Sequence, residues 1–392
     1  MKIKGFLKDV GGASRVTKRR QEAFDAASDK PAYFDPISAV AKALHPGLME
    51  FKLVEVKKAS PSSKTLVFSA PHFPYFKPGQ CVNLHVKIGD SVLTRPYSIT
   101  SAPYQTRGEK PQVEITVRRA NSGGIVADYL LDKAKVGDVF QGEVGEGIFY
   151  YDPIRDAKHV VALAGGSGIT PFVSMAKAIA HGDLDFDLTI LYGSVDEKDI
   201  VLRRDLDACV GEKVHVVHVL SGDNPKWKGE TGFITAELIQ KYSAEDTTYY
   251  VCGPQAMQSF VLGELAKLNV PARRIRIELL AQDSCDITKF EGFPKKLKDK
   301  TFQLTVVRGN TETVIPAKAT ESLVIALERA GLYIHTACRA GACGHCRMKV
   351  LEGTYFVRPT VDGRRRADLD FGYVHGCATY PTSDMKVRII AK

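Results

Sequence analysis

Four cysteines near the C-terminal end of the chain have the type and spacing of a metal-cluster ligand set. Cys338, Cys343 and Cys346 are arranged as C-x4-C-x2-C, and Cys377 follows after 30 intervening residues. This spacing is typical of a plant-type [2Fe–2S] cluster, whose first three thiolates converge from one tight loop. Glycines at positions 341 and 344 provide the backbone freedom that such a loop requires.

A zinc site is the main alternative for these cysteines. Structural zinc usually takes its cysteines as two C-x2-C pairs, and this chain has no second pair. A disulfide scaffold explains them less well, because eight cysteines in 392 residues are too sparse for a small secreted protein. We therefore predict a [2Fe–2S] cluster, and the rest of the chain should contain its source of electrons.

The stretch Arg95-Pro96-Tyr97-Ser98 ends a predicted strand and has the residue types of a flavin site. Arg95 can bind a phosphate through its guanidinium fork. Tyr97 offers an aromatic face to the flavin ring, and Ser98 can form a hydrogen bond with a ring nitrogen. Four residues of this kind are a weak signal when they stand alone.

A second glycine-containing stretch follows about 25 residues later along the chain. Gly123 and Gly124 precede a predicted helix that begins at Ile125. The amides at the start of that helix can hold the pyrophosphate of a flavin cofactor. A glycine turn before a purely structural helix explains the same residues equally well.

A predicted buried strand, residues 159–164, runs directly into Gly165-Gly166-Ser167-Gly168-Ile169-Thr170-Pro171. A strand, a glycine loop and then a helix form the context that a dinucleotide-binding loop requires. Gly166 and Gly168 allow the backbone to approach phosphate, and Pro171 suits the first turn of a helix. The match to the Rossmann fingerprint is partial, because proline stands where that fingerprint has its third glycine.

Another strand end, Cys252-Gly253-Pro254, is followed by a helix that contains Met257. Ligands of open α/β sheets collect at the carboxyl ends of the strands, so this stretch is also expected to contact the nucleotide. Spacing alone, however, is better explained by Cys252 as a small buried hydrophobic residue.

The periodicity of the chain changes along its length. Residues 1–48 match no pattern and are expected to be an N-terminal extension, with a short exposed helix near 18–27. Short alternating runs predict an antiparallel β-barrel in residues 49–153, whereas alternating strands and helices predict a doubly wound parallel sheet in 154–290. A lysine-rich linker, 291–300, precedes the cluster domain, 301–392. The expected barrel strands lie near residues 51–57, 65–69, 81–88, 91–99 and 112–118.

The net charge of +9 is concentrated in the cluster domain. Residues 293–392 contain 17 lysine and arginine residues against 9 aspartate and glutamate residues. We expect no nucleic-acid binding, because no recognised motif accompanies this charge. A protein electron acceptor with an acidic docking surface is the better explanation. No run is long and apolar enough to span a membrane and no secretory signal is evident, so we expect a cytoplasmic protein.

Taken in order, these stretches resemble the ferredoxin–NADP reductase superfamily, and in particular its members with a C-terminal plant-type ferredoxin domain. The resemblance extends over about residues 49–392. It implies a FAD-binding β-barrel domain, a NAD(P)-binding α/β domain and a ferredoxin domain of the β-grasp α+β type.

The resemblance also implies roles for individual residues. Ser98, Cys252 and Glu278 are expected to take part in catalysis beside the flavin and the nicotinamide. The residues expected to bind the flavin are Arg95, Pro96, Tyr97, Ser98, Gly123, Gly124 and Ile125. Those expected to bind the nicotinamide dinucleotide are Gly165, Gly166, Gly168, Thr170, Cys252, Gly253, Pro254 and Met257. The expected cluster ligands are Cys338, Cys343, Cys346 and Cys377.

Some residues leave the choice of cofactor open. Ala127 stands where FAD-binding relatives often have serine, which leaves FMN as an alternative to FAD. Asp196 can accept a hydrogen bond from a ribose 2′-hydroxyl and thereby favours NADH. Arg203 and Arg204 argue for NADPH instead.

We therefore expect an electron-transfer flavoenzyme in which NADH, or alternatively NADPH, reduces FAD. FAD would then reduce the [2Fe–2S] cluster, and the cluster would reduce a protein acceptor such as an oxygenase component. Two alternatives remain open: a reductase of an anaerobic redox protein such as hybrid-cluster protein, and a redox sensor that does not turn over.

Overall fold

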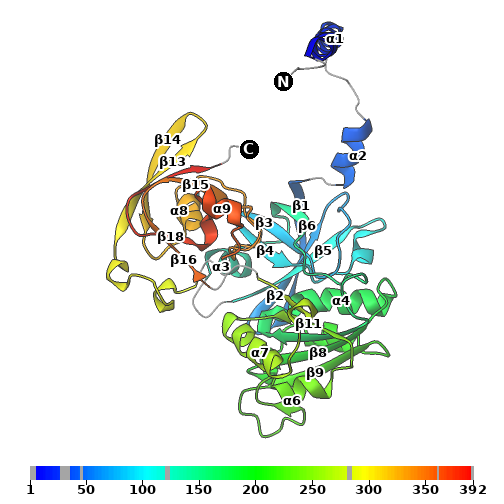
Figure 1. The fold of residues 1–392 in the computed structure, drawn as a ribbon. Helices are drawn as coiled ribbons and strands as arrows, with labels where there is room; N and C mark the ends of the chain where they lie inside the picture. The colour runs from blue at the N-terminus through cyan, green and yellow to red at the C-terminus, as the bar shows by residue number, and fades with distance from the viewer. Residues whose placement is uncertain are drawn as a thin grey trace. The chain divides into compact units, whose positions relative to one another are not determined.

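The computed structural model describes residues 6–26, 36–44, 47–119, 124–279, 285–359 and 362–389. The chain divides into two compact units, residues 1–45 and residues 46–392 (Figure 1). The first unit contains helix α1 (Phe6–Asp25), which covers residues 18–25 of the short helix expected near 18–27, and helix α2 (Pro36–Leu44). The second unit contains the strands that the structure describes and every described residue of the predicted sites.

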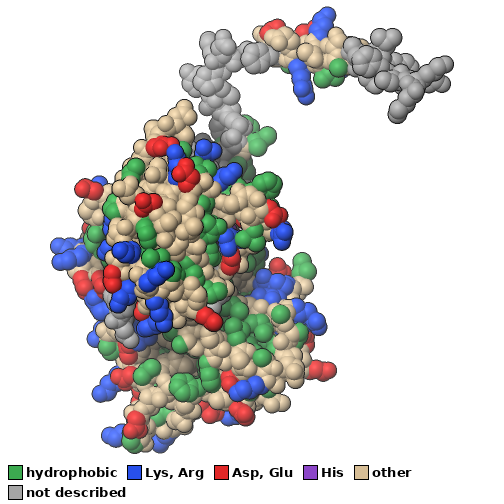
Figure 2. Space-filling view, turned by 60° about the vertical axis from the view of Figure 1, so that its left-hand side comes forward, with side chains coloured by type: hydrophobic (Ala, Val, Ile, Leu, Met, Phe, Trp, Pro, Cys, Tyr) green, Lys and Arg blue, Asp and Glu red, His purple; other side chains and the backbone are tan. Residues whose placement is uncertain are grey.

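Charged side chains of both signs are scattered over the face of the molecule that Figure 2 presents. Figure 2 shows Lys and Arg side chains spread over the face that it presents, with Asp and Glu side chains among them. None of the described helices is long and apolar enough to cross a membrane.

The first part of the second unit is an antiparallel sheet, called here the barrel domain. Its strand order is β4-β3-β6-β1-β2-β5, and a bridge between Ile99 and Ile115 brings the two edges together. Apolar side chains such as Leu53, Phe68 and Leu84 are fully buried inside it, as the alternating pattern predicts. The strands are β1 (Met49–Ser60), β2 (Ser63–Ser69), β3 (Cys81–Ile88), β4 (Ser91–Ser98), β5 (Gln112–Arg118) and β6 (Val139–Glu146), and α3 (Ile125–Asp132) lies between β5 and β6.

A parallel six-stranded sheet with helices on both faces follows, called here the nucleotide domain. Its strand order is β10-β9-β8-β7-β11-β12. The strands are β7 (His159–Gly165), β8 (Asp187–Ser194), β9 (Val214–Leu220), β10 (Glu230–Thr231), β11 (Thr247–Cys252) and β12 (Ile275–Ile277). The helices are α4 (Thr170–His181), α5 (Arg203–Asp207), α6 (Ala236–Lys241) and α7 (Gln255–Lys267).

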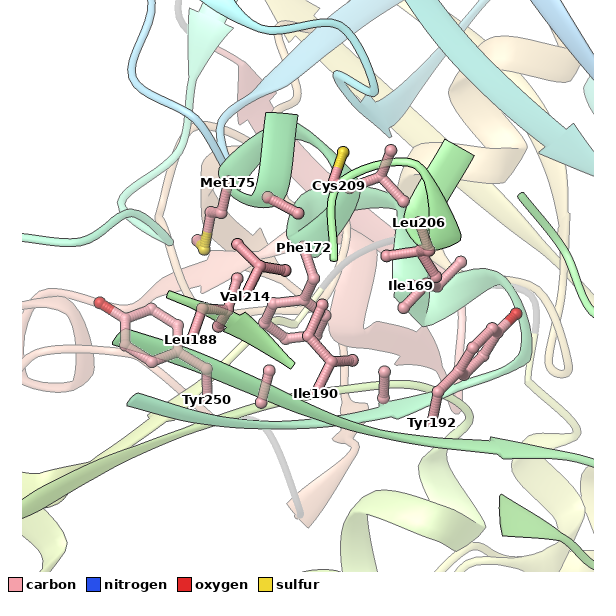
Figure 3. Packing of buried hydrophobic residues seen from close by; sticks show 14 of the residues in the cluster. Ile169, Phe172, Met175, Leu188, Ile190, Tyr192, Leu206, Cys209, Val214 and Tyr250 are labelled. Atoms are coloured by element: carbon pink, nitrogen blue, oxygen red, sulfur yellow. The ribbon is translucent and has the colours of Figure 1, made fainter. Parts of the chain in front are cut away.

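The continuous apolar run of β7 is explained by burial on both faces of the sheet. Val160 and Ala162 pack in one cluster with Phe172 of α4 and Leu206 of α5. Figure 3 shows this cluster, with side chains from the helices meeting those of the strands. The intervening residues Val161 and Leu163 pack on the opposite face with side chains of α6 and α7. Sheets of this kind are hydrophobic on both sides.

The order of the strands determines where a ligand can bind. The chain runs from β7 outward through β8 and β9, and then returns to place β11 on the other side of β7. Cys252, the last residue of β11, lies opposite Ala164 of β7. The loops that follow these two strands therefore meet at the switch point, where doubly wound sheets bind their ligands.

The C-terminal part, called here the cluster domain, is a mixed sheet packed against helix α8 (Leu323–Arg329). The strand order β14-β13-β19-β15-β17 contains one parallel pair, β13 with β19. The other elements are β13 (Thr301–Arg308), β14 (Thr311–Lys318), β15 (Arg347–Glu352), β16 (Tyr355–Val357), α9 (Arg366–Asp370), β17 (Tyr373–His375), β18 (Thr379–Pro381) and β19 (Met385–Ile389).

Part of the segment that precedes this domain packs against it. Ile287 and Phe293 are buried in one cluster with Ala319 and Tyr380. The ring of Phe293 also meets that of Phe356 edge-on at 5.6 Å between centroids. Apolar contacts therefore hold the segment between the nucleotide and cluster domains on the surface of the cluster domain.

Candidate active site and iron–sulfur centre

The glycine loop after β7 leaves no room for side chains. A Cβ atom on Gly165 would overlap the sulfur of Met257, and one on Gly168 would overlap the carbonyl group of Cys252. Gly166 has a φ of +54°, in the left-handed region. The structure thus brings together the two stretches that the sequence predicted to bind a dinucleotide. Close backbone approach of this kind suits a phosphate cradle.

A cavity of about 440 Å³ opens beside this loop. Gly165, Gly166, Pro254 and Met257 contribute to its lining. The other predicted nucleotide residues lie behind these: Thr170 donates a hydrogen bond from its hydroxyl to the carbonyl of Ser167, and Gly253 accepts one from Gln258 at 2.9 Å. Gly168, Thr170, Cys252 and Gly253 are therefore placed to shape the loop rather than to line the cavity.

Two aromatic side chains stand at the cavity. Phe233 and Phe260 are 67% and 39% exposed, and their ring centroids lie 5.6 Å apart. Both also line the cavity. Exposed aromatic faces of this kind suit the stacking of a planar heterocycle.

Arg118 is a cavity residue that the sequence reasoning missed. It is the last residue of β5 in the barrel domain, yet it lines the cavity of the nucleotide domain. Its guanidinium pairs with Asp199 at 2.7 Å and donates to the hydroxyl of Ser62 at 2.9 Å. Burial alone would raise the pKa of Asp199, but hydrogen bonds from Ser60 and Ser62 and the charge of Arg118 outweigh it and lower that pKa. The pair fixes a cation beside the glycine loop.

The predicted flavin residues lie on β4, an edge strand of the barrel sheet. Pro96 fits there because an edge strand tolerates a residue without an N–H group. Ser98 is buried opposite Cys81, and burial raises the pKa of the Tyr97 hydroxyl. Arg95 uses Nη1 to bind the carbonyl of Thr94 and the carboxylate of Glu328. Its Nε and Nη2 atoms bind no described residue, so part of the fork can bind a flavin phosphate.

The start of α3 differs from the simple picture of a phosphate site. Gly124 caps this helix, but its N–H donates to the carboxylate of Asp128 at 3.1 Å. A phosphate at this amide would have to replace that carboxylate. Ile125 is 70% exposed, and Gly123 lies outside the described residues. The roles of Gly123, Gly124 and Ile125 stay predictions.

Glu278 follows β12 and lies within electrostatic reach of three cysteines. Burial, and to a smaller extent the charge of Cys338, raise the pKa of Glu278 to about 8. Burial also raises the pKa values of Cys252 and Cys81, and in both cases the charge of Glu278 adds to the effect. The catalytic candidates Cys252 and Glu278 therefore lie near each other, near the cysteine behind Ser98, and near a predicted cluster ligand.

The cysteine loop of the cluster domain is a tight turn. Arg339, Gly341 and Gly344 have φ angles of +52°, +84° and +78°. The backbone N–H groups of Ala340 and Cys343 both point to the sulfur of Cys338, each at 3.4 Å. Hydrogen bonds from Cys343 and from backbone N–H groups lower the pKa of Cys338, while burial opposes that change. A loop that stabilises thiolates suits an iron–sulfur cluster.

The four cysteines are grouped in pairs. Cys346 and Cys377 are buried with their sulfurs 3.3 Å apart, and Cys338 is hydrogen-bonded to Cys343. The N–H of Gly341 donates to the sulfur of Cys377 at 3.2 Å. Two pairs of thiolates fit a binuclear cluster better than one zinc ion.

Comparisons with known proteins agree with this arrangement. Residues 50–151 match the oxidoreductase FAD-binding domain family, residues 162–262 the oxidoreductase NAD-binding domain family, and residues 306–382 the 2Fe-2S iron-sulfur cluster binding domain family. The fold is similar to that of phthalate dioxygenase reductase, with a TM-score of 0.63 and 21% identity over 88% of this chain and 98% of that one.

Two relatives are reductase components of monooxygenases. The carnitine monooxygenase reductase subunit of Escherichia coli K12 is 30% identical over 71% of this chain and 78% of its own length. The ferredoxin reductase component of 3-ketosteroid-9-alpha-monooxygenase from Mycobacterium tuberculosis is 29% identical over 86% of this chain and 94% of its own length. The chain therefore belongs to the ferredoxin–NADP reductase superfamily, within the group of FAD- and NAD-dependent oxidoreductases that carry a C-terminal [2Fe–2S] ferredoxin domain.

Proposed function

We propose that this chain is the reductase component of an oxygenase system and delivers electrons from NADH to the oxygenase component. The observation that carries the proposal is that three sites come close together. Cys81 pairs with Ser98 of the flavin strand β4, and Cys252 packs against Gly168 of the nucleotide loop. Glu278 acts electrostatically on both of these cysteines and is itself affected by Cys338 of the cysteine loop. The printed names of several relatives, including the glycine betaine monooxygenase reductase subunit, support an oxygenase as the acceptor.

When bound, the cofactors would supply the redox chemistry, namely hydride transfer from a nicotinamide to a flavin and one-electron transfer to a cluster. We propose that the residues of the chain position these groups. Arg95, Tyr97 and Ser98 hold the flavin on β4, while Gly165, Gly166 and Met257 bring the dinucleotide to it. Cys252 and Glu278 line the meeting point, and the raised pKa of Glu278 keeps its carboxyl protonated at neutral pH. A neutral carboxyl adds no negative charge beside a flavin that is gaining electrons.

An anaerobic titration with NADH, followed by visible absorption, tests this function. Flavin and iron–sulfur bands should both bleach, and NADH-dependent reduction of cytochrome c should follow. If the flavin bleaches and the iron–sulfur bands do not, the proposed path is wrong. If neither bleaches with NADH, the proposed donor is wrong.

We propose NADH as the donor because the cavity offers few cations. Arg118 is the one cationic residue in its described lining, and Arg118 is already paired with Asp199 beside Gly166. The remaining wall contains Ser194, Val195 and Ser221, with no lysine or arginine among its described residues. This wall therefore offers neither an arginine guanidinium nor a lysine ammonium to bind the 2′-phosphate of NADPH.

Two residues that could distinguish NADH from NADPH by their side-chain type make contacts outside the cavity. Asp196 accepts a hydrogen bond from the backbone N–H of Lys198 and does not line the cavity. Arg203 pairs with Glu197 and Asp207 instead. We expect kcat/KM to be at least roughly tenfold higher for NADH than for NADPH, and Val195→Arg should narrow that ratio by raising the value for NADPH. Equal values in the unaltered protein would contradict the proposal.

The acceptor surface is proposed to be the face of the cluster domain around α9. The segment before this helix lies against the cysteine loop: the N–H of Gly363 donates to the carbonyl of Gly341 at 3.1 Å. Leu369 and Phe371 are 48% and 66% exposed. Large exposed apolar side chains beside a redox centre suit the core of a transient interface.

The charge of the surface points to an acidic partner. Arg364 and Arg366 pair with Asp362 and Asp370, but the guanidinium of Arg365 pairs with no described residue. We propose that Arg365 meets a carboxylate of the acceptor and speeds the encounter. The rate of acceptor reduction should then fall as salt is raised.

Oxygenase components of carnitine, ketosteroid and glycine betaine monooxygenases are suitable probes of this surface. For an oxygenase component that the unaltered protein reduces, Phe371→Ser and Arg365→Glu should each raise the KM roughly tenfold, as substitutions of interface residues do. The matched control is Val314→Ser, because Val314 is 58% exposed on β14, at the opposite edge of the sheet from β17. Equal effects of Val314→Ser and Phe371→Ser would contradict this surface, as would unchanged KM values.

We also propose a cytoplasmic location. The four cysteines outside the cysteine loop set, Cys81, Cys209, Cys252 and Cys285, are free thiols. Free thiols are typical of a reducing compartment. Fractionation of cells that express the chain tests this proposal, and recovery in a secreted fraction would contradict it.

A further inference from the structure

Glu328 joins two arginines that belong to different sites. It lies in α8 of the cluster domain and is 6% exposed. Its carboxylate receives a two-point hydrogen bond from Arg339 of the cysteine loop, with distances of 2.7 and 3.0 Å. The same carboxylate pairs with Arg95 of the flavin strand at 3.2 Å. One buried carboxylate therefore connects the residue after the first cluster ligand with the predicted phosphate-binding arginine.

The same side chain also covers the edge of the barrel sheet. The backbone N–H of Thr94 donates to Oε1 of Glu328 at 3.2 Å. Thr94 lies on β4, which is an edge strand, so β3 is its neighbour on one side alone. An outward-pointing N–H on an edge strand needs a partner when it is buried. Glu328 supplies that partner from another domain.

Further contacts surround Glu328 and extend the boundary between the two domains. Asn83, which is 1% exposed, donates a hydrogen bond to the carbonyl of Thr336. His85 binds Glu143 at 3.0 Å and stacks on Tyr333 at 5.8 Å between ring centroids. The Asn83–Thr336 and His85–Tyr333 contacts connect the flavin-side sheet with the segment that leads into the cysteine loop, and Glu143 holds His85 from within the barrel. The boundary is thus a buried polar interface with defined partners.

We propose that Glu328 is a positioning residue for the flavin-to-cluster step. It binds neither the cluster nor the flavin, and it holds the cysteine loop in register against β4. Its negative charge is shared by Arg95 and Arg339, so its loss removes a common counter-charge from a largely buried place. Electron transfer weakens steeply as two centres separate, whereas hydride transfer to the flavin takes place between the barrel and nucleotide domains and does not need the cluster domain. The proposal rests on the flavin-to-cluster step and not on the identity of the acceptor.

Glu328→Gln in the full chain, loaded with FAD and cluster, tests the proposal. Amide hydrogen exchange at Thr94 should be roughly tenfold faster, which corresponds to about 1.4 kcal/mol. Reduction of the cluster after rapid mixing with NADH should slow severalfold, because the cysteine loop is held in productive register against β4 for a smaller fraction of the time. Ferricyanide reduction, which reads the flavin alone, should be unchanged.

Glu321→Gln is the matched control. Glu321 belongs to the same domain and pairs with Arg329 of α8 at 2.7 Å, but it contacts no described residue of the barrel domain. It should leave Thr94 exchange and cluster reduction unchanged. Glu328→Asp is a second variant that should still fold. Its shorter side chain keeps the negative charge beside Arg339 but no longer reaches the backbone N–H of Thr94. This variant should retain its iron and still show faster exchange at Thr94.

The outcomes separate the possibilities. Unchanged exchange at Thr94 and unchanged cluster reduction in Glu328→Gln would overturn the proposal. Equal losses in Glu321→Gln and Glu328→Gln would also overturn it, since they would indicate general damage to the domain. A failure of cluster reduction in the unaltered protein would instead reject the electron path itself.

Discussion

Arg118 and Gly166 approach so closely that a Cβ atom on Gly166 would lie 2.6 Å from Nη1 of the arginine. The two residues belong to different domains: Arg118 ends β5 of the barrel, and Gly166 begins the loop after β7. The glycine loop therefore receives its cation from the neighbouring domain. Close approach of the backbone and a fixed guanidinium together form a site for a pyrophosphate.

Gly166→Ala should weaken nucleotide binding. The φ of +54° is unfavourable for alanine by roughly 1 kcal/mol, and the new methyl group would push Arg118 away. We expect the KM for NADH to rise roughly tenfold, as the loss of a charge-assisted phosphate contact implies. Steady-state ferricyanide reduction measures this KM, and reduction of the flavin by dithionite should be unaffected.

Gly182→Ala is the matched control for that variant. Gly182 caps the C-terminus of α4 with a φ of +89°, and no atom lies within 4 Å of the position that an added Cβ would take. The substitution brings comparable backbone strain without touching the cavity. It should lower stability by roughly 1 kcal/mol and leave the KM for NADH unchanged. A similar rise in KM for both variants would show that strain, rather than the Arg118 contact, is responsible.

Gly168→Ala should be more damaging than Gly166→Ala. A Cβ atom there would overlap the carbonyl of Cys252 and lie 2.6 Å from the backbone nitrogen of Gly253. Backbone cannot move aside as a flexible arginine can, so the loops after β7 and β11 must separate. We expect a loss of roughly 2 kcal/mol in stability, together with loss of NADH-dependent flavin reduction.

Thermal unfolding and stopped-flow flavin reduction measure these two effects. Gly263→Ala provides the comparison, because Gly263 lies within α7 and has no atom within 4 Å of an added Cβ. Alanine should raise stability there slightly through its helix propensity. Normal flavin reduction in Gly168→Ala would contradict the close contact between the two loops.

Cys377→Ser should remove the cluster and leave the flavin functional. Cys377 is fully buried beside Cys346, where serine provides no thiolate for iron. Iron and sulfide content should fall to near zero, cytochrome c reduction should be lost, and ferricyanide reduction should persist. Cys209→Ser is the control, since Cys209 is buried among apolar side chains of the nucleotide domain. Loss of iron in both variants would contradict the ligand assignment.

Glu114 should make stability depend on pH. Burial raises the pKa of Glu114, but Lys177 and Lys57 outweigh it, so the pKa lies below its usual value. Glu114 pairs with Lys177 at 3.1 Å and with Lys57 at 2.8 Å. The pair with Lys177 connects the barrel domain with the nucleotide domain. Because the folded-state pKa is lowered, the stabilisation is present above the ordinary carboxyl pKa and is lost as pH falls through the folded-state value.

Glu114→Gln should therefore lower the free energy of unfolding at pH 7 by about 3 kcal/mol, the lower end for breaking a buried ion pair. The difference from the unaltered protein should shrink below about pH 4, where carboxyls become protonated. Urea unfolding at several pH values measures it. Asp185→Asn, in an exposed pair with Lys213, should have a much smaller effect. A pH-independent difference would show that packing, not charge, stabilises this site.

The amino-acid sequence by itself determined the features that depend on neighbours along the chain. The spacing from Cys338 to Cys346 predicted a tight loop, and the apolar run of residues 159–164 predicted a buried strand. The structure has a tight turn at the cysteines and a buried strand at β7, and both depend on the local geometry of a turn or a strand. Such geometry is encoded within a few residues. The role of the cysteines as ligands stays a prediction.

Only the tertiary structure decided which distant side chains meet. Arg118 looked like an ordinary residue at the end of a strand, and Glu328 like an acid on an amphipathic helix; no spacing indicated that either would reach another domain. The sequence also did not indicate that, at α3, the Asp128 carboxylate would accept the hydrogen bond from the Gly124 N–H that was expected to bind a flavin phosphate. The positions of these charges follow from how three domains pack, because burial forces each buried charge to find a partner wherever the fold provides one.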